Sequence, residues 1–480
     1  MAGEDGRVQP RDVSAIGEVD LADPRRQVAA RGERLRAALA AGNQLERATI
    51  VGSERQPALL HAYPYTVRGR QIELDEPAGT LHVDGRSRLS FPATRSLQGE
   101  QRRRAVPVVV TADQTLHIDG RAEPESLLSA VNLVGNVLAR SGDERLRAET
   151  MTLLLEEVTV PRPPPGPLAG VQQFLRDVRR QGRPGDQTAG SAGVSPAELA
   201  GLGTSPAGRR VRREPVKLLA HNALAERERR IKGDPQPLIL QNLSAPEMEV
   251  DIRARRIRTL GETILLMVNR QLEPASPADA EAIGLPSALM SSGPSQTALR
   301  CERSMLYVLG EDGPQRRDTV FFESGVLFRH VTGREIVKLE ELLPDLARDP
   351  QRLSQLKTRN TGLQCDRLEA MFTFAEPRAD RYGQQRSAPR LTWLNATGNA
   401  HLRDQQETLS REVYAHQLEF DRAGGFVRVL GLPQPKIDAR IYQEDARTGR
   451  YSTPAVGPEI VIDLKTNAVR TGPLAGEIAR

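Results

Sequence analysis

Aromatic residues are scarce in this chain of 480 residues. It has one Trp, seven Tyr and nine Phe, which together make up 4% of the sequence. Its interior must therefore be built mainly from Leu, Val, Ile and Ala. No run of about 18 apolar residues occurs, which excludes a transmembrane helix. No secretory signal is recognisable in the first residues, so we expect a cytoplasmic protein if Met1 is the native start.

The motifs of the common enzyme classes are also missing. The chain has no Gly-x-Ser-x-Gly elbow, no His-Glu-x-x-His helix and no phosphate loop ending in Gly-Lys-Ser/Thr. The segment Gly201-Leu-Gly-Thr-Ser-Pro206 starts like a dinucleotide fingerprint, but it follows no strand and ends in Pro. Cys301 and Cys365 are too few to form a metal cage by themselves. We predict a protein that is not an enzyme and uses no cofactor.

The basic charge is local. Residues 161–236 hold 14 basic and 7 acidic side chains, although the whole chain carries a net charge of only +5. The cluster at 209–213 could contact lipid phosphates or nucleic acid, but no aromatic residue lies within it to stack on a base. A solvated basic insertion is the favoured interpretation, and nucleic acid is an unlikely partner.

Composition divides the chain into three parts. Residues 161–236 contain 20 Pro or Gly residues and predict a flexible basic linker, with short helices at 171–178 and 218–231. The flanking parts, 1–160 and 237–480, show short apolar segments separated by Gly, which is typical of β repeats. Within the second part, the leucine spacing of 335–356 predicts a helical insertion that Pro344 and Pro350 interrupt.

Two nearly identical heptapeptides lie 35 residues apart and indicate a repeated strand. They are Thr80-Leu81-His82-Val83-Asp84-Gly85-Arg86 and Thr115-Leu116-His117-Ile118-Asp119-Gly120-Arg121. Each alternates apolar and polar residues and stops at Asp-Gly, which favours a half-buried strand that ends in a turn. A period of this length predicts stacked units.

The histidines of the two copies allow a second interpretation. His82 and His117 occupy equivalent positions, and in a stack they could share a divalent metal with Asp84 and Asp119. A solvated ladder at the end of a strand explains the same residues and is favoured, because ligand types alone do not make a site. We therefore predict no metal site.

A longer unit recurs in both flanking parts. A small residue is followed three positions later by an aliphatic one, and a Gly comes about 12 residues after that. The pattern occurs three times: at Gly69, Ile72 and Gly85, at Ala415, Leu418 and Gly431, and at Gly457, Ile460 and Gly472. We expect the small residue to lie at a corner, the aliphatic residue to begin an inward-facing strand and the Gly to make the return turn.

These residues resemble the OstA-like, or LptA-like, repeats of lipopolysaccharide-transport proteins. In that family a Gly-Asn-x-x-Leu strand precedes a small-acidic-x-aliphatic strand and an apolar strand that closes at Gly. The segments at 397–402, 414–420 and 426–431 resemble the whole unit, and those at 134–138 and 146–151 resemble its first two strands. His416 departs from the pattern, because it stands where an acidic residue is usual.

The resemblance implies a fold, a function and a location. The fold is a stack of antiparallel β-jelly-roll repeats with an open V-shaped section, whose apolar interior shields the acyl chains of lipopolysaccharide or a related outer-membrane lipid. The location is the periplasm or the outer membrane, and the partners are other β-jelly-roll transport proteins, or the chain itself, by edge-strand addition. Alternation within the strands gives the candidate groove residues: Leu81, Val83, Leu116, Ile118, Leu418, Phe420, Val427, Val429, Ile460 and Ile462.

Two questions stay open at this point. The same aliphatic residues are compatible with a structural β-solenoid scaffold whose core is closed and dry. Cys301 and Cys365 occur in matching frames where other copies have Ala148 or Ala415, which favours small buried side chains. A disulfide between them becomes possible only if their copies lie on neighbouring strands, about 4.8 Å apart. Such a bond would agree with an oxidising compartment.

Overall fold

The protein is all-β, as the sequence predicts, and its strands pair antiparallel throughout. The computed structural model describes residues 12–23, 28–39, 45–62, 65–95, 97, 101–120, 128–160, 210–229, 237–270, 294–311, 316–333, 337, 339–343, 359–374, 378–379, 385–386, 389–406, 409–445, 448–464, 466 and 468–472. Twenty-eight strands belong to one sheet, and two short ones form a separate pair. The chain divides into two compact units, with boundaries near residues 96–102, 142–146 and 220.

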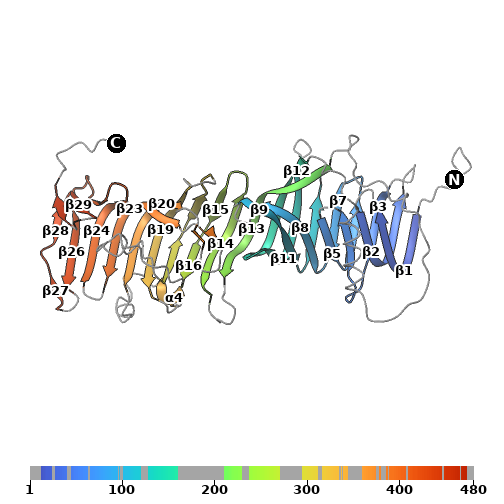
Figure 1. Ribbon diagram of the computed structural model, residues 1–480, viewed down its shortest axis with the longest axis horizontal. Coiled ribbons are helices and arrows are strands. Elements are labelled where there is room, and N and C mark those ends of the chain that lie inside the picture. Colours follow the sequence, from blue (N-terminus) through green and yellow to red (C-terminus); the bar gives the residue numbers. More distant parts are fainter. Residues whose placement is uncertain are drawn as a thin grey trace, which may run out of the picture. The chain divides into compact units, whose positions relative to one another are not determined.

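The first unit contains the amino-terminal strands (Figure 1). These are β1 (Asp12–Asp23), β2 (Val28–Leu39), β3 (Leu45–Val51), β4 (Ala58–Ala62), β5 (Tyr65–Gly69), β6 (Gln71–Asp75), β7 (Thr80–Asp84), β8 (Ser87–Arg95), most of β9 (Gln101–Ala112), β10 (Thr115–Asp119), β11 (Leu128–Ser141) and most of β12 (Glu144–Val160). The twin heptapeptides form β7 and β10, which pair directly and place His82 opposite His117. The predicted repetition is thus a pair of neighbouring strands.

The second unit contains the carboxy-terminal strands, which follow one another in chain order in Figure 1. After β13 (Arg210–Arg229), which the unit boundary divides, come β14 (Ile239–Asp251), β15 (Arg256–Leu260), β16 (Thr263–Asn269), β17 (Ser295–Cys301), β18 (Ser304–Val308), β19 (Arg317–Thr332), β20 (Asn360–Phe374), β21 (Arg378–Ala379), β22 (Gln385–Arg386), β23 (Pro389–Gln405), β24 (Leu409–Asp421), β25 (Phe426–Leu430), β26 (Ala439–Asp445), β27 (Arg450–Tyr451), β28 (Ala455–Gly457), β29 (Glu459–Asp463) and β30 (Val469–Thr471).

Several strands are longer than the sequence pattern suggests, because a Gly-Asn pair bends a strand instead of ending it. Gly398 and Asn399 lie inside β23 and have φ angles of 76° and 49°. The register shifts here against both neighbouring strands, so that β23 has one residue more than β20 and one more than β24. Such a bulge turns the strand sharply without breaking its pairing. The bulge lies next to Ala415, which pairs with Ala400 and is one of the small residues expected at a corner, and one strand continues through it.

The same corner recurs along the chain. Gly135 and Asn136 have positive φ in β11, and Ser324 and Gly325 have positive φ in β19. The Asn side chain of each Gly-Asn corner donates a hydrogen bond to an aspartate of the adjacent strand region. Asn136 donates to Asp113 at 3.2 Å, and Asn399 donates to Asp366 at 3.2 Å. Because a Cβ at Gly398 would come 2.2 Å from the Asp366 carboxylate, only Gly fits this position.

The predicted linker is wrong in its second half. Residues 161–209 and 230–236 lie outside the described residues, but 210–229 form β13. The predicted helix at 218–231 is therefore a strand over its described part. Leu218 and Ala220 are buried on one face, Asn222 has a φ of 50°, and burial resumes at Ala223. Burial at every second residue before an αL residue is the pattern seen at the other corners, with His221 in the place of Gly.

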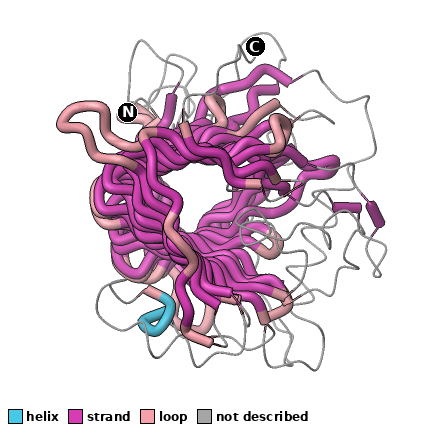
Figure 2. Tube along the Cα trace, turned by 90° about the vertical axis from the view of Figure 1, so that its left-hand side faces the viewer, coloured by secondary structure: helices cyan, strands magenta, loops and turns pink. Residues whose placement is uncertain are grey.

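One short helix covers the second unit from outside its strands (Figure 2). Helix α4 (Leu339–Leu342) lies in the predicted helical insertion, of which 344–356 fall outside the described residues. Leu342 packs with Ala298 and Val331. The side-chain amide of Gln296 also holds this segment: its Nε2 donates to the Val337 carbonyl at 2.7 Å, and its Oε1 accepts from the Val337 N–H at 2.9 Å.

Candidate functional site

The candidate site of the second unit is the face of its strands that carries the buried aliphatic residues, called the inner face below. The corners of β19, β20, β23 and β24 divide this face into two leaves. The first leaf includes Leu418 and Val427, and the second leaf includes Leu402 and Val413. Within each leaf, residues two apart point inward, and in β24 the corner shifts this alternation by one residue, from Val413 and Ala415 to Leu418 and Phe420.

Two apolar ladders cross the first leaf from strand to strand. They contain six of the predicted groove residues: Leu418, Phe420, Val427, Val429, Ile460 and Ile462. One ladder joins Met248, Thr259, Met305, Phe322, Leu368, Ala396, Leu418, Val429, Ile460 and Thr471. The other joins Val250, Ile257, Tyr307, Val320, Ala370, Leu394, Phe420, Val427, Ile462 and Val469. The inner face is thus mostly apolar across ten strands, and Thr259 and Thr471 are the polar members of the first ladder.

The first unit repeats the arrangement with its own predicted residues. Val83 pairs with Leu116, and Leu81 pairs with Ile118. The ladder through Val83 and Leu116 extends to Ile72 on one side and to Leu133 on the other. All ten predicted groove residues therefore lie on apolar faces of their units, four strands or more in width.

Burial is nearly complete at these positions. Nine of the ten predicted groove residues are between 0% and 7% exposed, and Ile118 is half-buried. Other side chains of the protein therefore already cover them. A closed core produces this burial directly, whereas a lipid could reach these residues only if the two leaves part.

The second leaf changes character along its strands. Nearest the corner the inward residues are small, with Ala400 paired to Ala415 and Ala439 paired to Gly457. The next position is aliphatic, and its ladder joins Leu243, Leu265, Leu299, Phe328, Leu363, Leu402, Val413, Ile441 and Ala455. The third position is polar, and its ladder joins Thr297, His330, Thr361, Asp404, Arg411 and Gln443.

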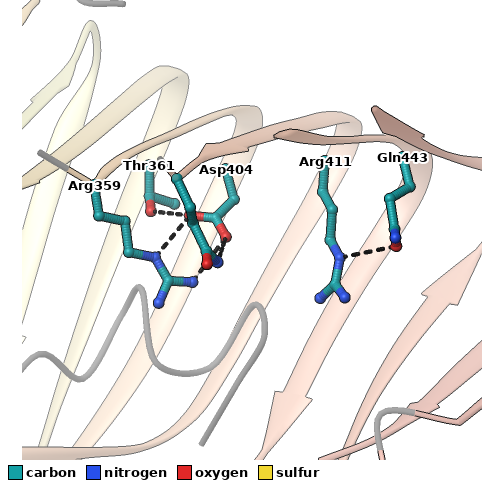
Figure 3. A network of polar contacts seen from close by, with 6 residues as sticks. Arg359, Thr361, Asp404, Arg411 and Gln443 are labelled. Atoms are coloured by element: carbon teal, nitrogen blue, oxygen red, sulfur yellow. Dashed lines mark hydrogen bonds and ion pairs between the residues drawn. The ribbon is translucent and has the colours of Figure 1, made fainter. Parts of the chain in front are cut away.

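Asp404 is the centre of this polar ladder (Figure 3). Arg359 holds its carboxylate with two hydrogen bonds, of 3.0 and 2.7 Å. Thr361 donates to the same carboxylate at 2.8 Å and Gln406 at 3.0 Å. The Asp404 side chain is fully buried. Loss of one partner of a buried pair typically costs about 3–5 kcal/mol, so this cluster fixes the local structure.

Arg411 gives the polar ladder its excess charge. It extends on the same face as Asp404, and its Nε donates to Gln443 at 3.3 Å (Figure 3). Burial lowers the pKa of Arg411, while Asp404 raises it and Arg359 lowers it. An arginine stays charged at neutral pH after such a shift. Together with Arg359 and Asp404 it leaves one uncompensated positive charge on the inner face.

His330 is the titratable neighbour of this cluster. Its Nδ1 lies 2.8 Å from Thr297 Oγ1. The pKa of His330 is lowered to about 4, mainly by burial. The Arg359 charge contributes to this decrease, and the Asp404 charge opposes it. The imidazole is therefore neutral at pH 7.

The first leaf ends in a second buried ion pair. Arg316 contacts Asp318 at 2.8 and 2.7 Å, and the Asp318 side chain is fully buried. Tyr307 donates to the same carboxylate at 2.6 Å, and the Gly310 N–H donates to it at 2.9 Å. Both leaves thus pass from an apolar middle to a buried Arg-Asp pair. The sequence analysis identified neither of these pairs.

The two cysteines are buried free thiols. Cys301 ends β17 and Cys365 lies in β20, and β19 pairs with both of these strands. The cysteines are therefore not on neighbouring strands, which was the condition for a disulfide. Burial raises the pKa of both thiols, for Cys365 to about 12. They occupy the same buried corner positions as Ala400 and Ala439.

The paired histidines of the first unit lie on the face opposite to Val83 and Leu116. The rings of His82 and His117 are 5.9 Å apart, and His82 Nε2 lies 3.0 Å from Asp84 Oδ1. Glu73 pairs with His82, and Asn132 pairs with His117. Across the part of the chain that the structure describes, no group of three or more His, Cys, Asp or Glu side chains is arranged to hold a metal.

Comparison with known proteins adds no family assignment. Within the described residues, no helix has the length and apolar character needed to span a membrane. No protein-family model matches the chain, and no curated protein is significantly similar to it in sequence.

Proposed function

We propose that this chain is a non-catalytic protein that binds and transports an amphipathic lipid, lipopolysaccharide or a related outer-membrane lipid. It resembles the periplasmic components of lipopolysaccharide transport, with stacked β-jelly-roll repeats of V-shaped section that part to admit acyl chains. The change from aliphatic to polar residues along the second leaf carries this proposal.

An amphipathic lipid would be matched by this order of residues. Its acyl chains would contact the aliphatic ladders of Leu402 and Leu418. Each buried methylene contributes about 0.8 kcal/mol to binding. Its anionic headgroup would lie at the polar ladder, where Arg411 supplies a positive charge and donors suited to phosphate.

The second candidate is a structural scaffold with a closed core. The low exposure of Leu418, Val429 and Ile460, between 0% and 2%, favours it. The carrier requires the leaves to separate around a lipid, whereas the scaffold keeps them packed.

Photo-crosslinking from the two faces of the sheet distinguishes the two functions. A photoreactive residue replaces Leu418 or Val429 on the inner face, or the exposed Arg258 on the outer face of β15, in full-length protein mixed with purified lipopolysaccharide. For the carrier we expect lipid adducts at the two inner positions and none at Arg258. Circular dichroism checks that each variant is folded. If the folded inner-face variants give no lipid adduct, the scaffold is supported.

Substitution of Arg411 tests the headgroup position without disturbing the apolar ladders. We expect Arg411→Gln to weaken binding of lipopolysaccharide about tenfold, because a charge-assisted hydrogen bond contributes about 1.5–3 kcal/mol. The exposed ion pair of Arg47 with Asp75 provides the control, and Arg47→Gln should leave the affinity unchanged. If both variants bind lipopolysaccharide as tightly as the parent protein does, the headgroup does not bind at this ladder.

The partners belong to the same proposal. Strand β30 pairs with β29 alone within the described residues, and Val469 on it is 49% exposed. An edge strand with free N–H and C=O groups can add another strand, from a second copy or from another β-jelly-roll transport protein. The resemblance to lipopolysaccharide-transport repeats implies that such partners would meet the chain in the periplasm or at the outer membrane.

A further inference from the structure

A groove of about 610 Å³ lies against the outer face of β23, β24 and β26 in the second unit. It is lined mainly by side chains that point away from Val413 and Ile441, with Ala400 and Ala415 at the corner, and the loop between Leu432 and Ile437 forms one wall. The groove has no part in the lipid proposal, because it lies on the opposite side of the sheet from the aliphatic ladders. Its volume lies in the range of small-ligand sites.

Aromatic rings are concentrated in this groove. Tyr414, Tyr442 and Tyr451 line it, although the whole chain has only seven Tyr. Tyr414 is 42% exposed and Tyr451 is 66% exposed. In a protein with so few aromatic residues, exposed rings collected at one place mark a binding surface.

The central ring is held in a fixed orientation. Tyr414 stacks on His401 with centroids 4.4 Å apart and an angle of 10° between the planes, and Tyr442 meets it edge-on at 6.0 Å. Glu412 braces both rings of the stack, since its carboxylate lies 2.9 Å from His401 Nε2 and accepts a hydrogen bond from the Tyr414 hydroxyl. A ligand would therefore meet a rigid apolar platform, which lowers the entropy cost of binding.

Polar groups surround the platform. Arg440 is exposed and lines the groove, and Asp438 lines it with one buried carboxylate oxygen, Oδ1, that has no hydrogen-bond partner among the described residues. Acidic and basic side chains alternate here, so the groove has no strong field of one sign. Such a site provides both donors and acceptors beside flat aromatic faces.

We propose that this groove binds a saccharide built from hexopyranose units. A pyranose ring has an apolar face of C–H groups, which packs on the electron-rich face of an aromatic ring, and hydroxyl groups at its edge that both donate and accept hydrogen bonds. The mixed charge does not favour a nucleic acid or a free phosphate, and the ring of polar groups does not favour an acyl chain.

The test uses the full chain and soluble, acyl-free sugars. The protein is screened on an array of hexopyranose oligosaccharides. It is then titrated by calorimetry with maltotriose, with chitotriose and with deacylated lipopolysaccharide core oligosaccharide. We expect a dissociation constant of about 1 mM or below for at least one sugar. Tyr414→Ala and Tyr451→Ala should each weaken that binding about tenfold or more, whereas Tyr414→Phe, which keeps the ring, should change it less than about threefold.

Val469→Ala is the control, because it removes an equally exposed apolar side chain outside the groove and should leave the affinity unchanged. Folding of each variant is checked by circular dichroism and by its unfolding midpoint. The proposal is overturned if no sugar of the array binds at millimolar concentration, or if folded Tyr414→Ala and Tyr451→Ala variants bind like the parent. Capture of peptides without sugars, with the same dependence on Tyr414, would also overturn it.

Discussion

At the scale of single residues, the sequence can predict which side chains of the polar ladder point inward, but it cannot predict their partners. The alternation that places Leu402 inward also places Asp404 inward, and both are buried. Nothing in the local sequence identifies Arg359 as the partner of Asp404, because the two residues are 45 positions apart and meet only through the pairing of β20 with β23. The pairing of strands therefore determines this site.

His330 should make stability depend on pH. Its pKa lies near 4 in the folded protein, below the ordinary value of 6.5, so the unfolded chain binds the proton more readily. Its contribution is fully present above about pH 6.5 and is lost as the pH falls through about 4, and it amounts to about 3 kcal/mol. Urea unfolding of the parent and of His330→Asn between pH 7 and 4 measures it.

We expect His330→Asn to lose that part of the pH dependence while keeping a group that can hydrogen-bond Thr297. His416→Asn serves as the control, because His416 is exposed, and its pH dependence should follow that of the parent. Identical curves for the parent and His330→Asn would show that burial does not depress the proton affinity of His330.

At the scale of secondary-structure elements, the Gly-Asn corner decides which parts of the fold the sequence could predict. The sequence placed Gly135-Asn136 and Gly398-Asn399 in strands of the repeat and expected the corner at small residues such as Ala415. The sequence did not reveal that strands such as β23 continue through them, because a glycine that ends a strand and a glycine that bends one look alike without the neighbouring strands. Strand β13 was mistaken for a helix for a related reason, since its corner has His221 in place of Gly and its charged residues also suit a helix.

The corner also allows a test of close packing. Gly398 and Gly425 both have positive φ, 76° and 72°. A Cβ would meet the Asp366 carboxylate at Gly398 and nothing within 4 Å at Gly425. Gly425→Ala should therefore cost only the backbone strain of about 1–2 kcal/mol, whereas Gly398→Ala should cost about 2 kcal/mol more. Chemical denaturation compares the two, and equal losses would mean that Asp366 yields freely.

The tyrosine groove was missed at the same scale. Its rings come from Tyr414, Tyr442 and Tyr451, on three different strands, with no spacing that forms a motif. The available signal was compositional: three of the seven tyrosines fall within the last 67 residues, and each has an acidic residue within seven positions. Without the register of β24 against β26 that signal could not be converted into a surface.

At the scale of the whole molecule, the two compact units both consist of antiparallel strands, but they can be followed by different spectroscopic signals. The single Trp393 lies in β23 of the second unit. Its fluorescence therefore follows the unfolding of that unit, while circular dichroism follows the strands of both units.

Substitution of a core leucine in each unit should separate the two signals. Leu418 and Leu116 are fully buried in the second and first units, 2% and 0% exposed. Either truncation to Ala should cost about 2–5 kcal/mol. We expect Leu418→Ala to shift the fluorescence transition in urea and Leu116→Ala to shift only part of the circular dichroism transition. A fluorescence transition displaced equally by both would show that the units unfold as one.

The corner inside each long strand has a consequence for how such a chain can change in length. Because one strand serves both leaves, deleting or inserting a single residue beyond the corner would turn every following side chain of that strand to the opposite face, exchanging Leu402 and Asp404 with their outward neighbours. Insertions in the turns, or of complete strands, leave this alternation intact. Tolerated length variation should therefore occur between strands and in steps of whole repeats.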